Sequence, residues 1–127
     1  MFTTVRRRFA VVAVSLLALA ASACNSPHTP DGSPPADATH VTVYATEFAY
    51  EVSSKTLEEG AVVFDLTNNG TMQHDLVLEG GPGGATKVIS PGETDSFFVT
   101  LEDGTYTLYC SVGNHRAQGM EFKITVM

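Results

Sequence analysis

The sequence is poor in cysteine, in basic residues and in long apolar runs, and each shortage excludes a class of protein. Two cysteines among 127 residues cannot cross-link a loop-rich domain that depends on disulfides. Only 7 Lys and Arg face 14 Asp and Glu, a formal net charge of −7 at pH 7. This balance argues against nucleic acid as a partner, because phosphate binding needs a basic surface. The remaining composition, 43% apolar and 17% charged, is that of an ordinary globular chain long enough for one domain.

The longest apolar run lies near the N-terminus and is too short to cross a bilayer. Residues 9–21 contain one polar residue, a serine, and follow three arginines at positions 6–8. A membrane-spanning helix needs about 20 apolar residues. A basic segment, a short apolar segment and the small residues 21–23 are instead typical of an export signal. We therefore expect residues 1–23 to be a signal peptide and the protein to function outside the cytoplasm.

The first cysteine, Cys24, directly follows this segment. Residues 19–24, Leu-Ala-Ala-Ser-Ala-Cys, resemble a bacterial lipobox, in which the cysteine becomes the lipidated first residue of the mature protein. Ala21 stands where leucine is usual, so cleavage by an ordinary signal peptidase is the alternative. The arginines also resemble a twin-arginine export signal, although Val5 stands where Ser or Thr is usual. We expect a lipid anchor at the cell membrane, or else a soluble periplasmic or secreted protein.

The segment that begins with this cysteine, residues 24–39, is rich in proline and small polar residues and has no apolar periodicity. Such a composition predicts an extended, flexible tether. From His40 onward the pattern changes to short apolar runs, so we place the folded domain at residues 40–127. His28 and His40 are isolated, and we assign them no role.

Residues 40–127 alternate apolar and polar side chains with a period of two, which predicts short β-strands. Gly, Asn, Pro and Asp bound the runs, and no segment has a helical stripe. We expect strands at residues 41–46, 61–67, 74–79, 95–101, 105–110 and 120–127. Parallel strands would need crossover helices. The pattern therefore predicts an all-β, antiparallel sandwich of two sheets.

The same alternation places the chemically reactive residues. Cys110 ends its strand on the apolar face, while His74 and Met120 each begin a strand on the apolar face. If the last two strands pair in antiparallel fashion, Cys110 and Met120 meet at one end of the sandwich. His115 lies in the polar loop between them, which we expect to be exposed. The loop of residues 80–85 is expected to border the same end.

Together His74, Cys110, His115 and Met120 supply two imidazoles, one thiolate and one thioether, a ligand set for one metal ion. Two His and one Cys in a plane with a weak axial Met form a blue copper site. Zinc fits less well, because structural zinc takes four firm Cys or His ligands and catalytic zinc keeps a water position. A single inward Cys, His or Met is most often a core residue. The spacing Cys-x4-His-x4-Met and the shared position favour the metal site.

Three segments carry motifs of a known family: Asn-Gly-Thr-Met-Gln-His at residues 69–74, Ser-Pro-Gly-Glu-Thr at 90–94 and Gly-Thr-Tyr-Thr-Leu-Tyr-Cys-Ser-Val-Gly-Asn-His-Arg-Ala-Gln-Gly-Met at 104–120. With these motifs the domain resembles the cupredoxins, small blue copper proteins such as plastocyanin, azurin and auracyanin. The resemblance implies a Greek-key β-sandwich that holds one copper ion, cycling between Cu+ and Cu2+. It implies three equatorial ligands and one axial ligand: His74, Cys110 and His115, with Met120.

The sequence departs from the family at the residue after the first histidine ligand. Asp75 stands where family members often have Asn, whose side chain ties two ligand loops together. A carboxylate can accept such hydrogen bonds but cannot donate them, so the bonding around the ligands is expected to differ. The four residues between Cys110 and His115 resemble azurin or auracyanin more than plastocyanin. No disulfide is expected within the domain, because Cys24 lies outside it.

From these features we expect a type 1 copper protein that carries single electrons between redox partners outside the cytoplasm. A transient partner would dock near His115, and the protein would be a monomer attached to the membrane only through its lipid. Copper storage, delivery or sensing is the alternative. An enzyme is not expected: Cys110 faces the interior, which disfavours a nucleophile with His115 as its base. The blue copper domain of an oxidase or nitrite reductase is poorly supported, because the chain has no second histidine cluster.

Overall fold

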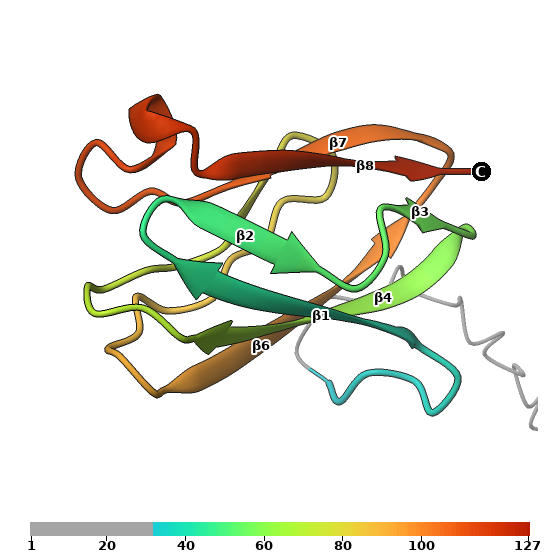
Figure 1. Ribbon diagram of the computed structural model, residues 1–127. Helices are drawn as coiled ribbons and strands as arrows, with labels where there is room; N and C mark the ends of the chain where they lie inside the picture. The colour runs from blue at the N-terminus through green and yellow to red at the C-terminus, as the bar shows by residue number, and fades with distance from the viewer. Residues whose placement is uncertain (1–31) are drawn as a thin grey trace, which may run out of the picture.

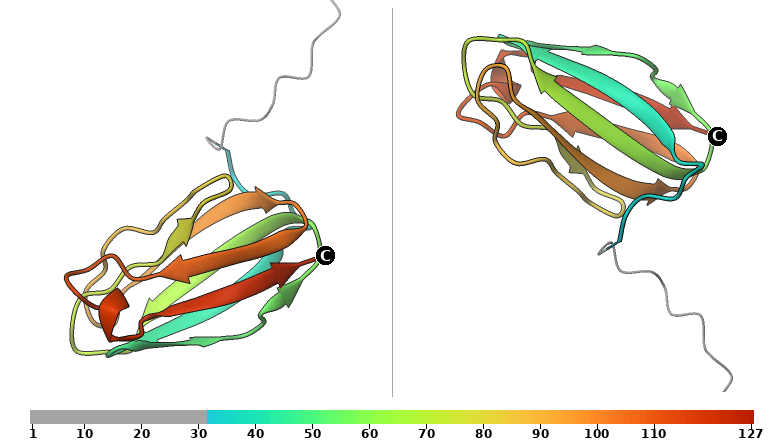
Figure 2. Two further views of the ribbon diagram at one scale, coloured as in Figure 1. Left: turned by 90° about the horizontal axis from the view of Figure 1, so that it is seen from above. Right: turned by 90° about the horizontal axis from the view of Figure 1, so that it is seen from below.

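The structure is a computed structural model that describes residues 32–127 (Figures 1 and 2). The expected signal peptide, the lipid anchor at Cys24 and the first part of the tether lie outside the described residues. Among residues 32–127, no helix is both long enough and apolar enough to cross a membrane.

The described residues form two facing β-sheets. The elements in chain order are β1 (Thr39–Thr46), β2 (Ala49–Val52), β3 (Thr56–Leu57), β4 (Gly60–Asn68), β5 (Val77–Glu79), β6 (Thr94–Leu101), β7 (Gly104–Tyr109), the 3₁₀ helix η1 (Arg116–Gln118) and β8 (Glu121–Val126). One sheet has the strand order β2-β1-β4-β6, and the other has the order β3-β8-β7-β5. The two sheets lie as the layers of a sandwich (Figure 1), which confirms the all-β prediction.

The strand pairing is mixed, and this corrects the expectation of a purely antiparallel sandwich. β1 pairs with β4 in parallel, and β3 pairs with β8 in parallel. Parallel neighbours need a long connection, usually a helix. Here residues 47–59 make the connection between β1 and β4 with two short strands, β2 and β3, one in each sheet. Neither strand is among those predicted, because strands of 4 and 2 residues are too short for the alternation to be recognised.

The core lies between the sheets and follows the period of two. Val62, Phe64 and Leu66 of β4 are fully buried, and Leu108 and Ile124 face them from the other sheet with exposed fractions of 0% and 1%. Each such side chain stabilises the fold by about 1.5–3 kcal/mol relative to its exposed state. A close-packed interior of this kind resists deformation. The strand ends that emerge from it are therefore rigid supports for neighbouring side chains.

One end of the sandwich gathers the residues of interest. Figure 2 shows η1 and the C-terminus at opposite ends of the molecule, and we call the end with η1 the site end. β7 runs toward the site end and β8 returns from it, with Tyr109 opposite Glu121. Cys110 follows β7 directly and Met120 precedes β8, so the N–H of Cys110 donates a 3.1 Å hydrogen bond to the carbonyl of Met120.

The expected strand at residues 74–79 forms only in part, because β5 begins at Val77. His74 is nevertheless fixed by an antiparallel bridge to Ile89. The N–H of His74 donates to the carbonyl of Ile89 at 3.1 Å, and the reverse hydrogen bond measures 2.8 Å. These two bonds hold the backbone of His74 as firmly as a strand would.

Candidate metal centre

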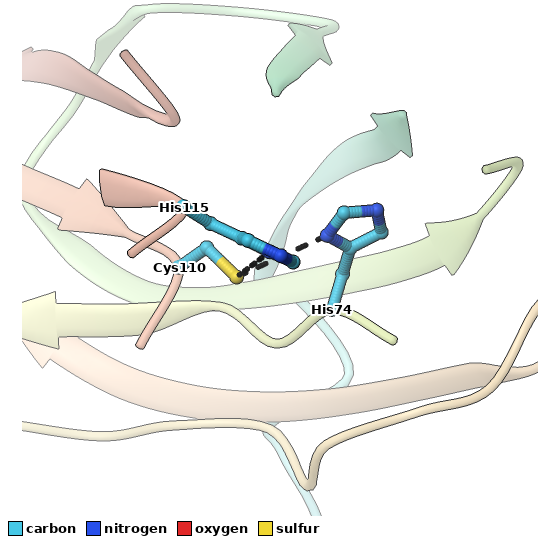
Figure 3. Close-up of side chains that lie close together, drawn as sticks. All are labelled: His74, Cys110 and His115. Carbon is cyan, nitrogen blue, oxygen red and sulfur yellow. Dashed lines mark hydrogen bonds between the residues drawn. The ribbon is translucent and has the colours of Figure 1, made fainter. Parts of the chain in front are cut away.

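Three of the four expected ligands converge at the site end. Figure 3 shows the side chains of His74, Cys110 and His115 pointing toward one another from separate segments of the chain. One nitrogen or sulfur atom of each lies within 4.8 Å of the others. The Sγ of Cys110 is 3.5 Å from Nδ1 of His115 and 3.9 Å from Nδ1 of His74.

These separations fit a single metal ion. Bonds of about 2.3 Å to sulfur and about 2.0 Å to nitrogen, at an angle near 110–120°, place the two donor atoms about 3.5–3.7 Å apart. Of the two observed separations, 3.5 Å lies at the lower limit of this range and 3.9 Å lies just above its upper limit. A thiolate with two imidazoles is a donor set that suits copper or zinc. The residues present therefore fit a metal ion without rearrangement of the backbone.

Met120 lies next to this group and is fully buried. Its N–H donates to the carbonyl of His115 at 3.2 Å, and its carbonyl accepts from Cys110, so its backbone joins two of the ligand residues. Gly119 has a φ of 101°, a left-handed conformation that lets the chain turn sharply from η1 into β8. A thioether is a neutral, soft donor suited to a weak axial position. The axial role of Met120 remains a prediction.

The three converging side chains are almost completely shielded from solvent. His74, Cys110 and His115 have exposed fractions of 0%, 1% and 4%. Burial raises the pKa of the Cys110 thiol. At neutral pH the metal-free protein therefore carries a protonated thiol, which must lose its proton when a metal binds.

The burial of His115 differs from the expected exposure of its loop. Gly113, Asn114 and Ala117 are exposed as predicted. The imidazole, however, packs edge-on against the ring of Phe48, with 5.1 Å between the ring centroids. Phe48 belongs to the turn between β1 and β2, far from His115 in sequence, so this shielding had no local signal.

The loop of residues 80–85 lies away from the site end, which corrects a second expectation. Pro82 lines a shallow hollow together with Tyr106 and Glu102, near the beginning of β7. Cys110 follows the other end of that strand. β5 is antiparallel to β7 and therefore runs away from the site end. The loop that follows β5 consequently lies toward the opposite end of the sandwich.

Asp75 ties the segments of two ligands together. Its carboxylate is buried and accepts hydrogen bonds from both the backbone N–H and the hydroxyl of Ser111. The hydroxyl of Tyr50 donates to the backbone carbonyl of Asp75. Burial raises the pKa of the Tyr50 phenol, so this donor keeps its proton. In both hydrogen bonds with Ser111 the side chain of Asp75 is the acceptor, as predicted for a carboxylate.

Asn68 shapes the turn that leads into His74, a role that is not among the sequence predictions. Its buried amide nitrogen donates to the carbonyls of Met72 at 2.8 Å and Ile89 at 3.1 Å. Its oxygen accepts from the N–H of Gly70 at 2.9 Å. The Asn-Asn-Gly sequence at residues 68–70 signalled a turn, but not that its first side chain would be fully buried.

Glu47 is a second residue near the ligands that is not among the sequence predictions. Its Oε1 atom lies 3.0 Å from Nε2 of His74 and accepts the N–H groups of Thr71 and Met72, each at 2.8 Å. The hydrogen bond from Met72, followed by that from His74, lowers the pKa of Glu47 to about 2. Glu47 is therefore ionised at neutral pH. The nitrogen of His74 that faces Cys110 is the other one, Nδ1.

Comparisons with a family model and with solved structures agree on the family and the fold of the chain. The chain matches the family described as "Cupredoxin-like domain" over residues 9–126. Its fold is similar to that of auracyanin from the photosynthetic bacterium Roseiflexus castenholzii, with 22% identity, 71% of this chain and 98% of that chain covered, and a TM-score of 0.60. Auracyanin B gives 23% identity, coverage of 76% and 92%, and a TM-score of 0.61.

Auracyanin A, a "blue" copper protein from the green thermophilic photosynthetic bacterium Chloroflexus aurantiacus, is also similar in fold. The sequence identity is 21%, the alignment covers 69% of this chain and 99% of that chain, and the TM-score is 0.58. No curated protein matches the chain in sequence. At these identities the solved structures show a common fold.

Proposed function

The chain belongs to the cupredoxin-like family, and on this premise we propose that it is a type 1 copper protein that transfers single electrons. The observation that carries the proposal is the buried group of His74, Cys110 and His115, whose donor atoms lie within 4.8 Å of one another. Copper, when bound there, supplies a one-electron couple between Cu+ and Cu2+.

The protein's part is to hold the ligands still. His74, Cys110, His115 and Met120 would hold the ion. Thiolate, imidazole and thioether are a donor set that accommodates both oxidation states of copper. Backbone hydrogen bonds join Cys110 to Met120 and Met120 to His115, and a bridge to Ile89 holds His74. Ligands restrained in this way move little when the charge of the ion changes.

The surface above His115 suits a brief contact with a redox partner. The exposed residues around its shielded imidazole are small or uncharged: Gly113, Asn114, Ala117, Gln118 and Gly119. The exception is Arg116, whose side chain is 39% exposed and pairs with Glu79 and Glu121. A partner that contacts these uncharged residues would desolvate no charged side chain other than that of Arg116, and the transfer of a charge from water is costly. The excess of acidic residues in the chain would favour a basic partner, an attraction that salt weakens.

The location is part of the proposal and is supported by the sequence alone. The pattern of residues 1–24 favours export and a lipid anchor on Cys24, with residues 24–39 as the tether. We infer a monomer that meets its partners outside the cytoplasm, at the membrane. A soluble periplasmic or secreted form is the alternative.

Electron transfer is favoured over storage, delivery or sensing by the burial of the ligands. An ion that must be handed on needs an accessible ligand, whereas the three converging residues are at most 4% exposed. The same burial disfavours catalysis, because a substrate would need to reach Cys110.

Voltammetry combined with copper competition tests the proposal. The copper-loaded protein should give a reversible one-electron wave and should lose copper only slowly to a chelator. A redox-inactive complex would overturn electron transfer, and rapid, complete transfer of copper to the chelator would favour delivery.

A further inference from the structure

The turn between β1 and β2 contacts the copper site through a charged residue, Glu47. We propose that Glu47 is a positioning residue that presents Nδ1 of His74 to the metal and lowers the reduction potential of the site. The inference rests on the proposed copper function and deepens it. Its geometric basis is the 3.0 Å contact between Oε1 of Glu47 and Nε2 of His74.

This contact determines which imidazole nitrogen carries a proton. A carboxylate only accepts hydrogen bonds, so Nε2 must be the donor, and in the neutral ring Nδ1 is then left with a free lone pair. Nδ1 is the atom that lies 3.9 Å from Sγ of Cys110. Glu47 therefore selects the tautomer in which His74 can bind a metal beside Cys110.

The carboxylate is itself held in place. Two further hydrogen bonds, from the N–H groups of Thr71 and Met72, end on the same oxygen atom that faces His74. Gly70 makes this approach possible, since a Cβ atom at that position would collide with Oε1 of Glu47. The side chain of Glu47 is 26% exposed, and the histidine it contacts is fully buried. The loop before His74 is thus folded around the carboxylate.

A fixed negative charge at this position acts on the redox equilibrium. A carboxylate that accepts a hydrogen bond from a ligating histidine raises the basicity of that ligand. Cu2+ gains more from a basic ligand and a nearby negative charge than Cu+ does, because its own charge is larger. Glu47 should therefore stabilise the oxidised form more strongly than the reduced form.

The neighbouring residue supports the second histidine. Phe48 packs against the ring of His115, with an interplanar angle of 68°. One turn thus touches both histidines, and only Glu47 does so with a charge. A substitution that removes only the charge of Glu47 can therefore change the reduction potential without removing the packing of Phe48 against His115.

The matched pair Glu47→Gln and Glu51→Gln tests the proposal in the copper-loaded full chain. Both variants remove one negative charge, but Glu51 is exposed on β2 and has no contact with His74. Replacing an outer-shell partner typically changes metal affinity 10–100-fold. We expect Glu47→Gln to weaken Cu2+ binding relative to Cu+ by about tenfold, which raises a one-electron potential by about 59 mV. Glu51→Gln should leave the potential unchanged.

Equal reduction potentials in Glu47→Gln and Glu51→Gln would overturn the inference. The proposed function would still stand in that case if the copper-loaded wild-type protein is blue. A second measurement does not need copper. Nitrogen NMR of the metal-free protein should show His74 protonated at Nε2, and Glu47→Ala should shift the ring toward a mixture of tautomers. A wild-type His74 protonated at Nδ1 would contradict the positioning role. If the wild type instead fails to form a blue complex, the function is wrong, and the NMR result alone decides what Glu47 does.

Discussion

The carboxylate of Asp75 accepts a 2.7 Å hydrogen bond from the backbone N–H of Ser111. Each of these residues directly follows an expected ligand, Asp75 after His74 and Ser111 after Cys110. The bond therefore joins two ligand segments that are far apart in sequence. It also places a buried carboxyl group close to the sulfur atom that is expected to bind copper.

Replacement of Asp75 by Asn separates its charge from its shape. Asp75→Asn should raise the reduction potential, because a negative charge near Cys110 stabilises Cu2+ more than Cu+. The variant should also lower the free energy of unfolding by about 1–2 kcal/mol, because Ser111 loses a charged acceptor. Voltammetry and denaturant titration measure the two effects. Asp103→Asn, at an exposed turn residue, is the charge-matched control, and an identical potential in the two variants would contradict the prediction.

The axial assignment of Met120 is tested by Met120→Gln. An amide oxygen is a harder donor than a thioether and favours Cu2+, so the protein should retain copper and its potential should fall. Met127→Gln, at a methionine that is 73% exposed and directly follows β8, should leave the potential unchanged. If Met120→Gln also left the potential unchanged, the axial ligand would have to be sought elsewhere.

Arg116 anchors the ligand loop to the sheet, and its contribution to stability should depend on pH and salt. Its guanidinium donates to both carboxylate oxygens of Glu79, at 2.8 and 2.9 Å, and to Glu121 at 2.8 Å. It also lies 4.1 Å from the centroid of the Tyr109 ring. Arg116→Gln should therefore lower the free energy of unfolding, and the difference should shrink as salt screens these exposed pairs.

The pH dependence follows from Glu79, whose pKa Arg116 lowers below its usual value of 4.5. A lowered pKa in the folded state means that the ion pair stabilises the fold above about pH 4.5. This stabilisation is lost as the pH falls through the lowered pKa. Denaturant titrations of wild type and Arg116→Gln should hence differ at neutral pH and converge in acid. A difference that stays constant down to acid pH would contradict this assignment.

Removal of copper should destabilise the protein by mass action. A ligand present at 100 times its dissociation constant stabilises the folded state by about 2.7 kcal/mol. A strong chelator should therefore lower Tm, and added copper should restore it. Addition of copper to the metal-free protein should also release a proton, because burial raises the pKa of the Cys110 thiol and this thiol must ionise when it binds the metal. A Tm that is insensitive to both treatments would show that the folded protein does not bind copper.

The sequence was informative wherever a strand fixes the direction of its side chains. The period of two placed Cys110 and Met120 inward at neighbouring strand ends, and both are buried there. The alternation could not reveal β2 or β3, which have only 4 and 2 residues, nor the parallel pairing that their path allows. The position of the loop of residues 80–85 depends on the direction of β5, which is antiparallel to β7 and which the local alternation does not reveal.

The contacts around the histidines depend on packing between distant segments. Glu47 and Phe48 reach His74 and His115 from a turn that carries no recognisable motif. Their roles follow from the closure of the sandwich, which brings the β1–β2 turn over the site end. No local pattern in the sequence encodes such a contact.

The most direct test of the account is the visible spectrum of the full-length protein titrated with Cu2+, beside that of Cys110→Ser. A thiolate bound to Cu2+ in the proposed site predicts an intense charge-transfer band. The band should saturate at one equivalent of copper in the wild type and be absent in Cys110→Ser. A wild-type complex that binds copper but stays colourless would contradict the central claim.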